Sequence, residues 1–182
     1  LEKWKNEERP AVATYQYLPP RTTPYDPETG KSEPNFSYGY VAEAVEVEVD
    51  VETGQLQVIN VICADDVGKA VNPQQVQGQI EGAVVQAAGY GILENFLQKD
   101  GLSLTKTLST YLIPTVLDVP TRVESVILEY PDPIGPFGAR GMGEMPYLPF
   151  VPALVSAVHN ASGCWFDRFP LIPERVLEGL SS

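Results

Sequence analysis

The segment with the clearest chemical potential is GPFGARGMGEMP, residues 135–146, which holds four glycines and one carboxylate. Glycine lets a backbone adopt positive φ and approach a ligand closely, but it costs conformational entropy, so such a loop favours a ligand-binding role. Its acid, Glu144, has only Arg140 as a charged neighbour in the loop, and burial would suit it to act as a general base. The alternatives for Glu144 are a helix N-cap or an exposed loop acid. A phosphate cradle is a weaker interpretation, because the loop lacks both the P-loop lysine and the dinucleotide-binding spacing.

A second unusual pattern lies in residues 72–95. Asn72 followed by Pro73 is typical of a helix start and predicts a helix that runs to about residue 95. Successive residues of a helix turn by about 100°, which separates three kinds of side chain around this one. The apolar face holds Val76, Ile80, Ala83, Val84 and Ala87, the glycine face holds Gly78, Gly82 and Gly89, and a stripe between them holds Gln75, Gln79 and Gln86. Each helical glycine costs roughly 1 kcal/mol relative to alanine, so this pattern indicates either a tight packing contact or a bound cofactor.

The other residues capable of chemistry have simpler interpretations. Asp65 and Asp66 suggest the carboxylate pair of a glycoside hydrolase together with Glu144, but neighbouring residues on a strand point in opposite directions. His159 lies in a predicted helix without an acid or serine at useful spacing, which favours a partly buried structural role. We expect Glu43, Glu46 and Glu48 on the solvated or interface face of a strand. Cys63 and Cys164, the two cysteines of the chain, lack metal-ligand spacing and are expected to be buried and reduced.

These segments need a scaffold, and the sequence predicts one. Residues 38–51 alternate valines with acids, and residues 56–63 are again rich in β-formers, so a turn at residues 52–55 makes a hairpin. Residues 122–130 predict a further strand, and residues 152–161 and 173–180 predict short helices. The fold class is therefore α/β mixed (α+β), with a β-hairpin-based mixed sheet packed against the long glycine-bearing helix and short C-terminal helices. Residues 1–35 hold six prolines and predict an extended arm, which leaves residues 36–182 as the folded lobe.

Composition narrows the possible functions. The 182 residues are 43% hydrophobic and 20% charged, which is typical of a globular domain. The formal net charge of −12 disfavours contact with nucleic acid or an anionic membrane surface. The apolar runs are shorter than the ~18 residues that span a bilayer, and the first residues lack the apolar core of a signal peptide. We therefore expect a cytoplasmic location.

The order of the motifs resembles the C-terminal part of the molybdenum-binding large subunit of the xanthine dehydrogenase and aldehyde oxidase family. The residues that carry the resemblance are Gly78, Gln79, Gly82 and Gly89 on the helix and the run from Gly138 to Glu144. Further matches, in order and spacing, are DVG at 66–68, NP at 72–73, STY at 109–111, IP at 113–114, PL at 170–171 and PERVL at 173–177. The resemblance covers residues 36–180. Met145-Pro146 replaces the more common Pro-Pro or His-Pro after the glutamate, a change that affects the shape of the pocket rather than the base.

The resemblance implies a concrete chemistry. In this family the molybdenum is held by a pyranopterin dithiolene and by oxo, sulfido and hydroxo ligands, with no protein ligand to the metal. Glu144 would take the proton from the hydroxyl while that oxygen, derived from water, attacks an aldehyde, purine or related heterocycle and hydride moves to the sulfido ligand. The cofactor-binding residues it implies are Gly78, Gln79, Gly141, Met142 and Gly143.

The resemblance also implies partners. The missing N-terminal half of the molybdenum subunit should share the cofactor, so we expect the isolated lobe to retain none and to be inactive. Iron–sulfur clusters and FAD are expected on partner subunits, and the whole assembly is expected to dimerise. The alternative is a noncatalytic structural or assembly subunit that retains the fold.

Overall fold

The computed structural model describes residues 12–181 and divides the chain into two compact units, Leu1–Phe36 and Ser37–Ser182. The described part of the first unit is extended chain, closed by a bridge between Thr23 and Glu33. Asp26 stabilises the turn inside that bridge, because its Oδ1 accepts from the main-chain N–H of Glu28 at 2.9 Å. Residues 1–11 of the predicted arm lie outside the described residues.

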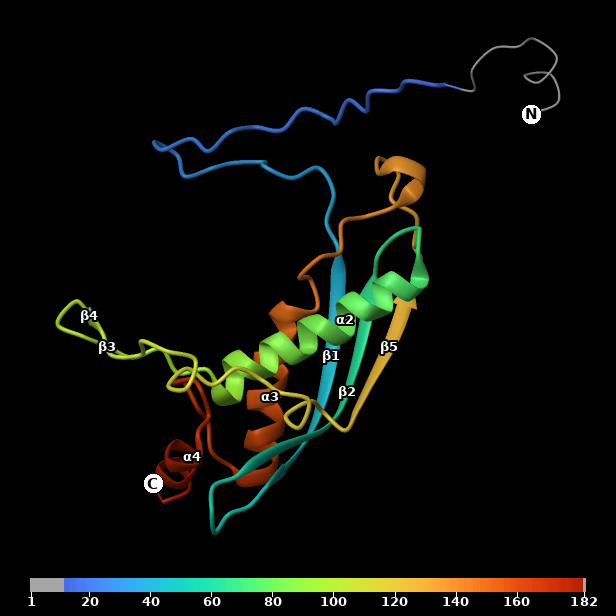
Figure 1. Ribbon diagram of the computed structural model, residues 1–182. Coiled ribbons are helices and arrows are strands. Elements are labelled where there is room, and N and C mark those ends of the chain that lie inside the picture. Colours follow the sequence, from blue (N-terminus) through green and yellow to red (C-terminus); the bar gives the residue numbers. More distant parts are fainter. Residues whose placement is uncertain (1–11, 182) are drawn as a thin grey trace. The chain divides into compact units, whose positions relative to one another are not determined.

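The second unit is built on the predicted mixed sheet (Figure 1). β1 (Tyr40–Val49) pairs antiparallel with β2 (Leu56–Asp66), and β2 pairs in parallel with β5 (Arg122–Leu128). The order β1-β2-β5 confirms the hairpin and the further strand. A small second hairpin, β3 (Gln98–Lys99) with β4 (Leu102–Ser103), lies in the irregular stretch between the long helix and β5.

The long helix is α2 (Pro73–Ala88), which runs across the strands in Figure 1. Asn72 caps it as predicted, with its side chain accepting from the main-chain N–H of Gln75 at 3.2 Å. The α-helix ends earlier than expected, because a π-helical turn, Gly89–Leu93, follows it and Glu94 is already extended. Among the described residues no helix is both long and apolar enough to span a membrane.

The C-terminal helices are α3 (Tyr147–Ser162) and α4 (Pro173–Leu180). α4 matches the prediction, but α3 begins at Tyr147 rather than at Pro152. Proline favours a helix start, and inside a helix it removes one hydrogen bond and clashes with the preceding turn, a cost of about 3 kcal/mol that packing has to offset. Buried Phe150, Leu154 and Val158 continue the apolar stripe across Pro152, and this packing explains the longer helix.

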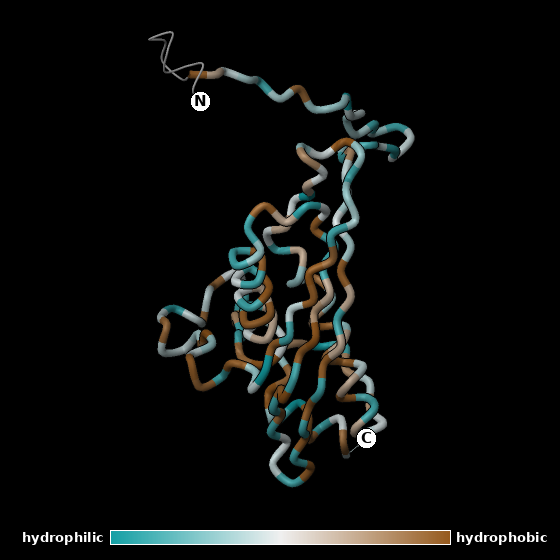
Figure 2. Tube along the Cα trace, turned by 90° about the vertical axis from the view of Figure 1, so that its right-hand side faces the viewer, coloured by the Kyte–Doolittle hydropathy of each residue, from teal (hydrophilic) through white to brown (hydrophobic). Residues whose placement is uncertain are grey.

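One face of the sheet forms the core together with α2 and α3. Its centre is formed by residues of β2, α2 and α3 that include Val61, Val84, Phe150 and Leu154, and Figure 2 shows apolar residues recurring along these elements. Val45 lies opposite Val61 in the ladder and packs against the same core. Glu43, two residues earlier on the same strand, shares this face, so the expectation that it lies with Glu46 and Glu48 on the solvated or interface face is wrong.

Candidate functional site

The glycine-rich loop is held against the turn that follows β2. The main-chain oxygen of Gly138 accepts from the N–H groups of Lys69 at 2.8 Å and Asp132 at 3.0 Å, and the N–H of Arg140 donates to Val67 O at 2.9 Å. Gly68 has φ +61°, and a Cβ there would collide with the main-chain oxygen of Gly138. A side chain at position 68 would therefore separate the loop from the sheet.

This pairing brings the loop beside the first turns of α2, with a hollow of about 320 Å³ between them. We call it the α2–loop hollow. It is lined by residues of the turn after β2, the start of α2 and the loop: Val67, Lys69, Ala70, Val71, Asn72, Gln75, Val76, Gln79, Ala139, Arg140 and Met142. Gln79 and Met142, two of the predicted cofactor-binding residues, thus meet at one site although they lie far apart in the sequence.

The predicted glycines border this hollow without lining it. Gly78 and Gly82 are exposed on α2, and a Cβ at either position would meet no atom within 4 Å. At about 100° per residue, Gly82 lies roughly 60° around the helix from Gln79. Gly141 and Gly143 are likewise exposed, with open space where a Cβ would lie. Gly89 differs, because it is buried and a Cβ there would collide with Glu94 and Pro114, so its role is close packing.

Glu144 lies at the end of the loop, immediately before α3. Its main-chain oxygen accepts from the N–H of Tyr147 at 3.1 Å, but its side chain is exposed and does not line the hollow. The burial expected for a general base is therefore not supplied by the described part of the chain. A covering surface would have to come from protein outside it.

Two buried carboxylates, Asp66 and Asp132, flank Arg140. The sequence patterns did not predict that these three side chains lie together. Arg140 lies 3.6 Å from Asp66 and 3.7 Å from Asp132, and its side chain is 11% exposed. Asp132 accepts from the main-chain N–H groups of Ile134 and Gly135 and from the Ser37 hydroxyl, and these bonds, with the charge of Arg140, hold its pKa below the ordinary value. The only available signal was that Arg140 is the one cation in residues 131–146.

Among the described residues no group of three or more His, Cys, Asp or Glu side chains could hold a metal ion. Lys69 and Arg140 are the cations that line the α2–loop hollow. Lys69 is paired with exposed Glu129 at 2.8 Å. The site therefore offers amide, main-chain and cationic groups to a ligand rather than metal ligands.

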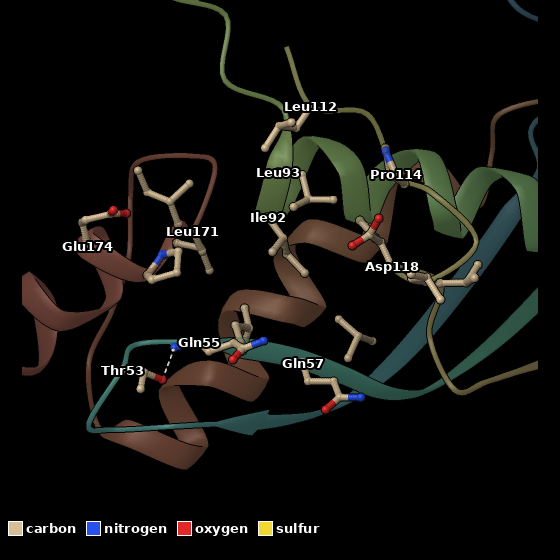
Figure 3. Close-up of a pocket in the computed structure, with 17 residues that line it drawn as sticks. Thr53, Gln55, Gln57, Ile92, Leu93, Leu112, Pro114, Asp118, Leu171 and Glu174 are labelled. Carbon is tan, nitrogen blue, oxygen red and sulfur yellow. Dashed lines mark hydrogen bonds between the residues drawn. The ribbon is translucent and has the colours of Figure 1, made fainter. Parts of the chain in front are cut away.

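A larger cavity, of about 570 Å³, lies between β2, the π-helical turn, residues 112–119 and the start of α4. Figure 3 shows apolar side chains, among them Ile92, Leu93 and Leu171, turned towards it. Of its two acids, Glu174 lies at the start of α4, and Asp118 is already bound to Thr115, by the main-chain N–H at 2.8 Å and by the hydroxyl at 2.7 Å. None of the predicted site residues lines this cavity, and its polar groups form no catalytic arrangement, so the smaller hollow is the better candidate.

Comparison with known proteins identifies the family of the chain. The model of the molybdopterin cofactor-binding domain family matches residues 2–120. A probable subunit of xanthine dehydrogenase from Bacillus subtilis is 40% identical over 159 residues, which are 87% of this chain and 21% of that protein. An aldehyde oxidoreductase of Megalodesulfovibrio gigas is 32% identical over 181 residues, covering 100% of this chain and 20% of the relative, so that match includes the glycine-rich loop.

Solved structures show the same relationship. An aldehyde oxidoreductase from Desulfovibrio gigas superposes with a TM-score of 0.81 and 31% identity, over 100% of this chain and 20% of the other. Quinoline 2-oxidoreductase from Pseudomonas putida 86 superposes with a TM-score of 0.70 and 36% identity, over 75% of this chain and 18% of the other. The chain thus spans about a fifth of the length of the relatives it matches.

Proposed function

Because the chain belongs to the molybdopterin cofactor-binding domain family, we propose that it forms one wall of a molybdenum cofactor site and carries the general base of a hydroxylase. The observation that supports this most directly is the meeting of Gln79 and Met142 at the α2–loop hollow. In this proposal Gly78, Gln79, Gly141, Met142 and Gly143 bind the cofactor, and Glu144 acts as the base.

The residues present fit such a group. The open space beside Gly78 and Gly82 allows a flat, rigid molecule to approach the backbone of α2, and this offsets the helical cost of glycine. The absence of a metal-ligand cluster in the described residues suits a cofactor that holds its metal through its own sulfur atoms. When bound, the cofactor supplies a two-electron acceptor for oxidation of the substrate.

The role of the chain in the reaction is to position the cofactor and to remove a proton. Glu144 is exposed at the end of a loop whose glycines Gly141 and Gly143 have open space beside them, so its carboxylate is free to reach a reacting group. A second lobe that covers this surface would exclude water, and a carboxylate in a poorly hydrated site is a stronger base. We propose that this cover is the N-terminal part of the same molybdenum subunit.

The names of the relatives suggest the wider setting. They include probable subunits of xanthine dehydrogenase, an aldehyde oxidoreductase and the large chain of a carbon monoxide dehydrogenase. We propose that the present protein works in an assembly, and that its partner subunits carry iron–sulfur clusters and FAD. We further propose that it hydroxylates an aldehyde, a purine or a related heterocycle with oxygen taken from water.

The substitution Glu144→Gln in the complete assembly tests the proposal. The carboxylate is not proposed as a metal ligand, so molybdenum content should stay unchanged. Turnover should fall by about 100- to 10,000-fold, the usual contribution of a general base, with a smaller effect on KM. Reductive half-reaction rates and metal content should be measured on the same preparation.

Glu48→Gln is the matched control, because Glu48 is exposed and lies towards the opposite end of β1 from the glycine-rich loop. It should leave both the rate and the metal content unchanged. A Glu144→Gln variant that is fully metal-loaded and nearly as fast as the wild type would exclude the proposed base. That outcome would favour a structural or assembly role.

A further inference from the structure

The segment that carries the proposed base, residues 141–144, is held at both ends. At one end the side chain of Arg140 is 11% exposed and lies beside Asp66 at the end of β2, and at the other Pro146 is fully buried where α3 begins. Between these ends Gly141 and Gly143 would meet no atom within 4 Å if they carried a Cβ. The position of Glu144 therefore depends on how the two ends are held.

Arg140 is held by both terminal nitrogens of its guanidinium group. Nη1 donates to the main-chain oxygen of Tyr38 at 2.6 Å, and Nη2 donates to that of Tyr130 at 3.3 Å. Its carbon Cζ lies 5.3 Å from the centre of the Tyr40 ring, within cation–π range. The planar fork of arginine can bind two carbonyl oxygens at once, whereas a lysine ammonium acts as a point charge.

The carboxylates on either side of Arg140 are themselves fixed. Asp66 Oδ1 accepts from the N–H groups of Gly68 and Tyr130, both at 3.1 Å. Asp132 is held by the bonds described above. The cation thus lies between two anchored anions, Asp66 at the end of β2 and Asp132 four residues after β5, which restrict its position.

The residues on either side of this segment both contact the start of β1. Tyr38 accepts from Arg140 and Tyr40 lies under it, while the residue between them, Gly39, is so close to Met145 that a Cβ would collide with the Met145 sulfur. Residues 38–40 therefore contact both Arg140, which precedes residues 141–144, and Met145, which follows them.

We propose that Arg140, seated on residues 38–40, is a positioning residue that fixes the path of residues 141–144 and so aims the carboxylate of Glu144. It acts through the loop and does not contact the reacting atoms. This inference rests on the proposed function for its catalytic consequence, but the anchoring itself can be measured independently.

The test compares Arg140→Gln, Arg140→Lys and Arg122→Gln in the complete assembly. Hydrogen exchange of the peptide that covers residues 135–146 reports the anchoring, while kcat, KM and molybdenum content report its consequence. In Arg140→Gln, exchange of this peptide should become faster and kcat should fall by about 10- to 100-fold, the effect of a misplacement of about 1 Å, with KM little changed. Arg140→Lys should recover part of both, because it restores the charge between Asp66 and Asp132 but not the fork.

Arg122→Gln is the matched control. It removes an exposed arginine that pairs with Glu124 at 2.7 Å at the start of β5 and does not line the α2–loop hollow, so exchange and kcat should remain those of the wild type. Unchanged exchange in Arg140→Gln would overturn the inference, and so would faster exchange with a normal kcat.

If Arg140→Gln does not fold, Arg140→Lys and Tyr40→Leu decide by the same two readouts. If Glu144→Gln is fully active, the proposed function fails, while the exchange result still decides whether Arg140 anchors the loop.

Discussion

Glu43 of β1 lies directly opposite Cys63 of β2 in the antiparallel ladder. The Cys63 thiol donates to Asp65 Oδ2 at 3.0 Å, and both carboxylate oxygens of Glu43 are buried with no hydrogen-bond partner among the described residues. Burial, to which the nearby Asp65 adds, raises the pKa of Glu43 from 4.5 to about 7. Burial also raises the pKa of Asp65.

These shifts predict how stability depends on pH. A folded-state pKa above the unfolded value means that the folded chain binds the proton more tightly. The contribution of Glu43 is therefore fully present below pH 4.5 and is lost as the pH rises through about 7. We expect the free energy of unfolding to fall across this window, with Glu43 contributing at most about 1.4 kcal/mol per pH unit. Carboxyls with lowered pKa values, such as Asp132, act at lower pH and leave this window unaffected.

Glu43→Gln should flatten this slope, measured by urea unfolding of the 182-residue chain between pH 4.5 and pH 8. A residual slope from Asp65 should remain, because the pKa of that group is also raised. Glu48→Gln, at an exposed position of the same strand, should leave the wild-type slope unchanged. If the Glu43→Gln and wild-type curves are parallel, Glu43 does not titrate as described.

The sequence could predict the sheet but not this acid. Alternating valines at 45, 47 and 49 identify the buried face of β1, and Glu43 has the same parity, so the period of two did contain the signal. Glu43 was nevertheless expected to be solvated like Glu46 and Glu48, because acidic side chains are ordinarily exposed. Asn72 and Pro173 were sufficient for the starts of α2 and α4, since capping and proline placement are local effects.

The site was predictable only in part, for a physical reason. Gln79 and Met142 could be proposed individually from the family resemblance, but their meeting depends on how the loop packs against the turn after β2. The seating of Arg140 between Asp66 and Asp132 is equally non-local. A spacing pattern reports neighbours on one element, not contacts between elements.

Gly68 provides a test of the contact between the loop and the sheet. Gly68→Ala should destabilise the chain by more than the roughly 1 kcal/mol that a left-handed residue costs, because its Cβ would meet the main-chain oxygen of Gly138, which cannot easily move. Urea unfolding should be combined with hydrogen exchange of residues 135–146, which should become faster. Gly101→Ala is the control, since Gly101 also has positive φ but open space around it. Equal losses in the two variants would show that the loop contact adds nothing beyond backbone strain.

The glycines of α2 predict opposite effects in the isolated chain and in the assembly. Because no atom lies within 4 Å of a Cβ at position 78 or 82, Gly78→Ala and Gly82→Ala should fit without strain. Each should stabilise the isolated chain by about 0.5–1 kcal/mol, the gain in helix propensity. In the complete assembly the same methyl groups would occupy the space proposed for the cofactor, so pterin and molybdenum content should fall.

Gln74→Ala is the control for this experiment, because Gln74 is an exposed residue of α2 that does not line the α2–loop hollow. It should change stability only slightly and leave the cofactor content of the assembly unchanged. Urea unfolding of the isolated chain and metal and pterin analysis of the assembly should be carried out on the same set of variants. A stabilised chain with a depleted assembly is the combination that a close ligand at the glycine face predicts. Glycine variants that are stabilised and retain a full complement of pterin would place the cofactor elsewhere and leave the glycine stripe without a binding role.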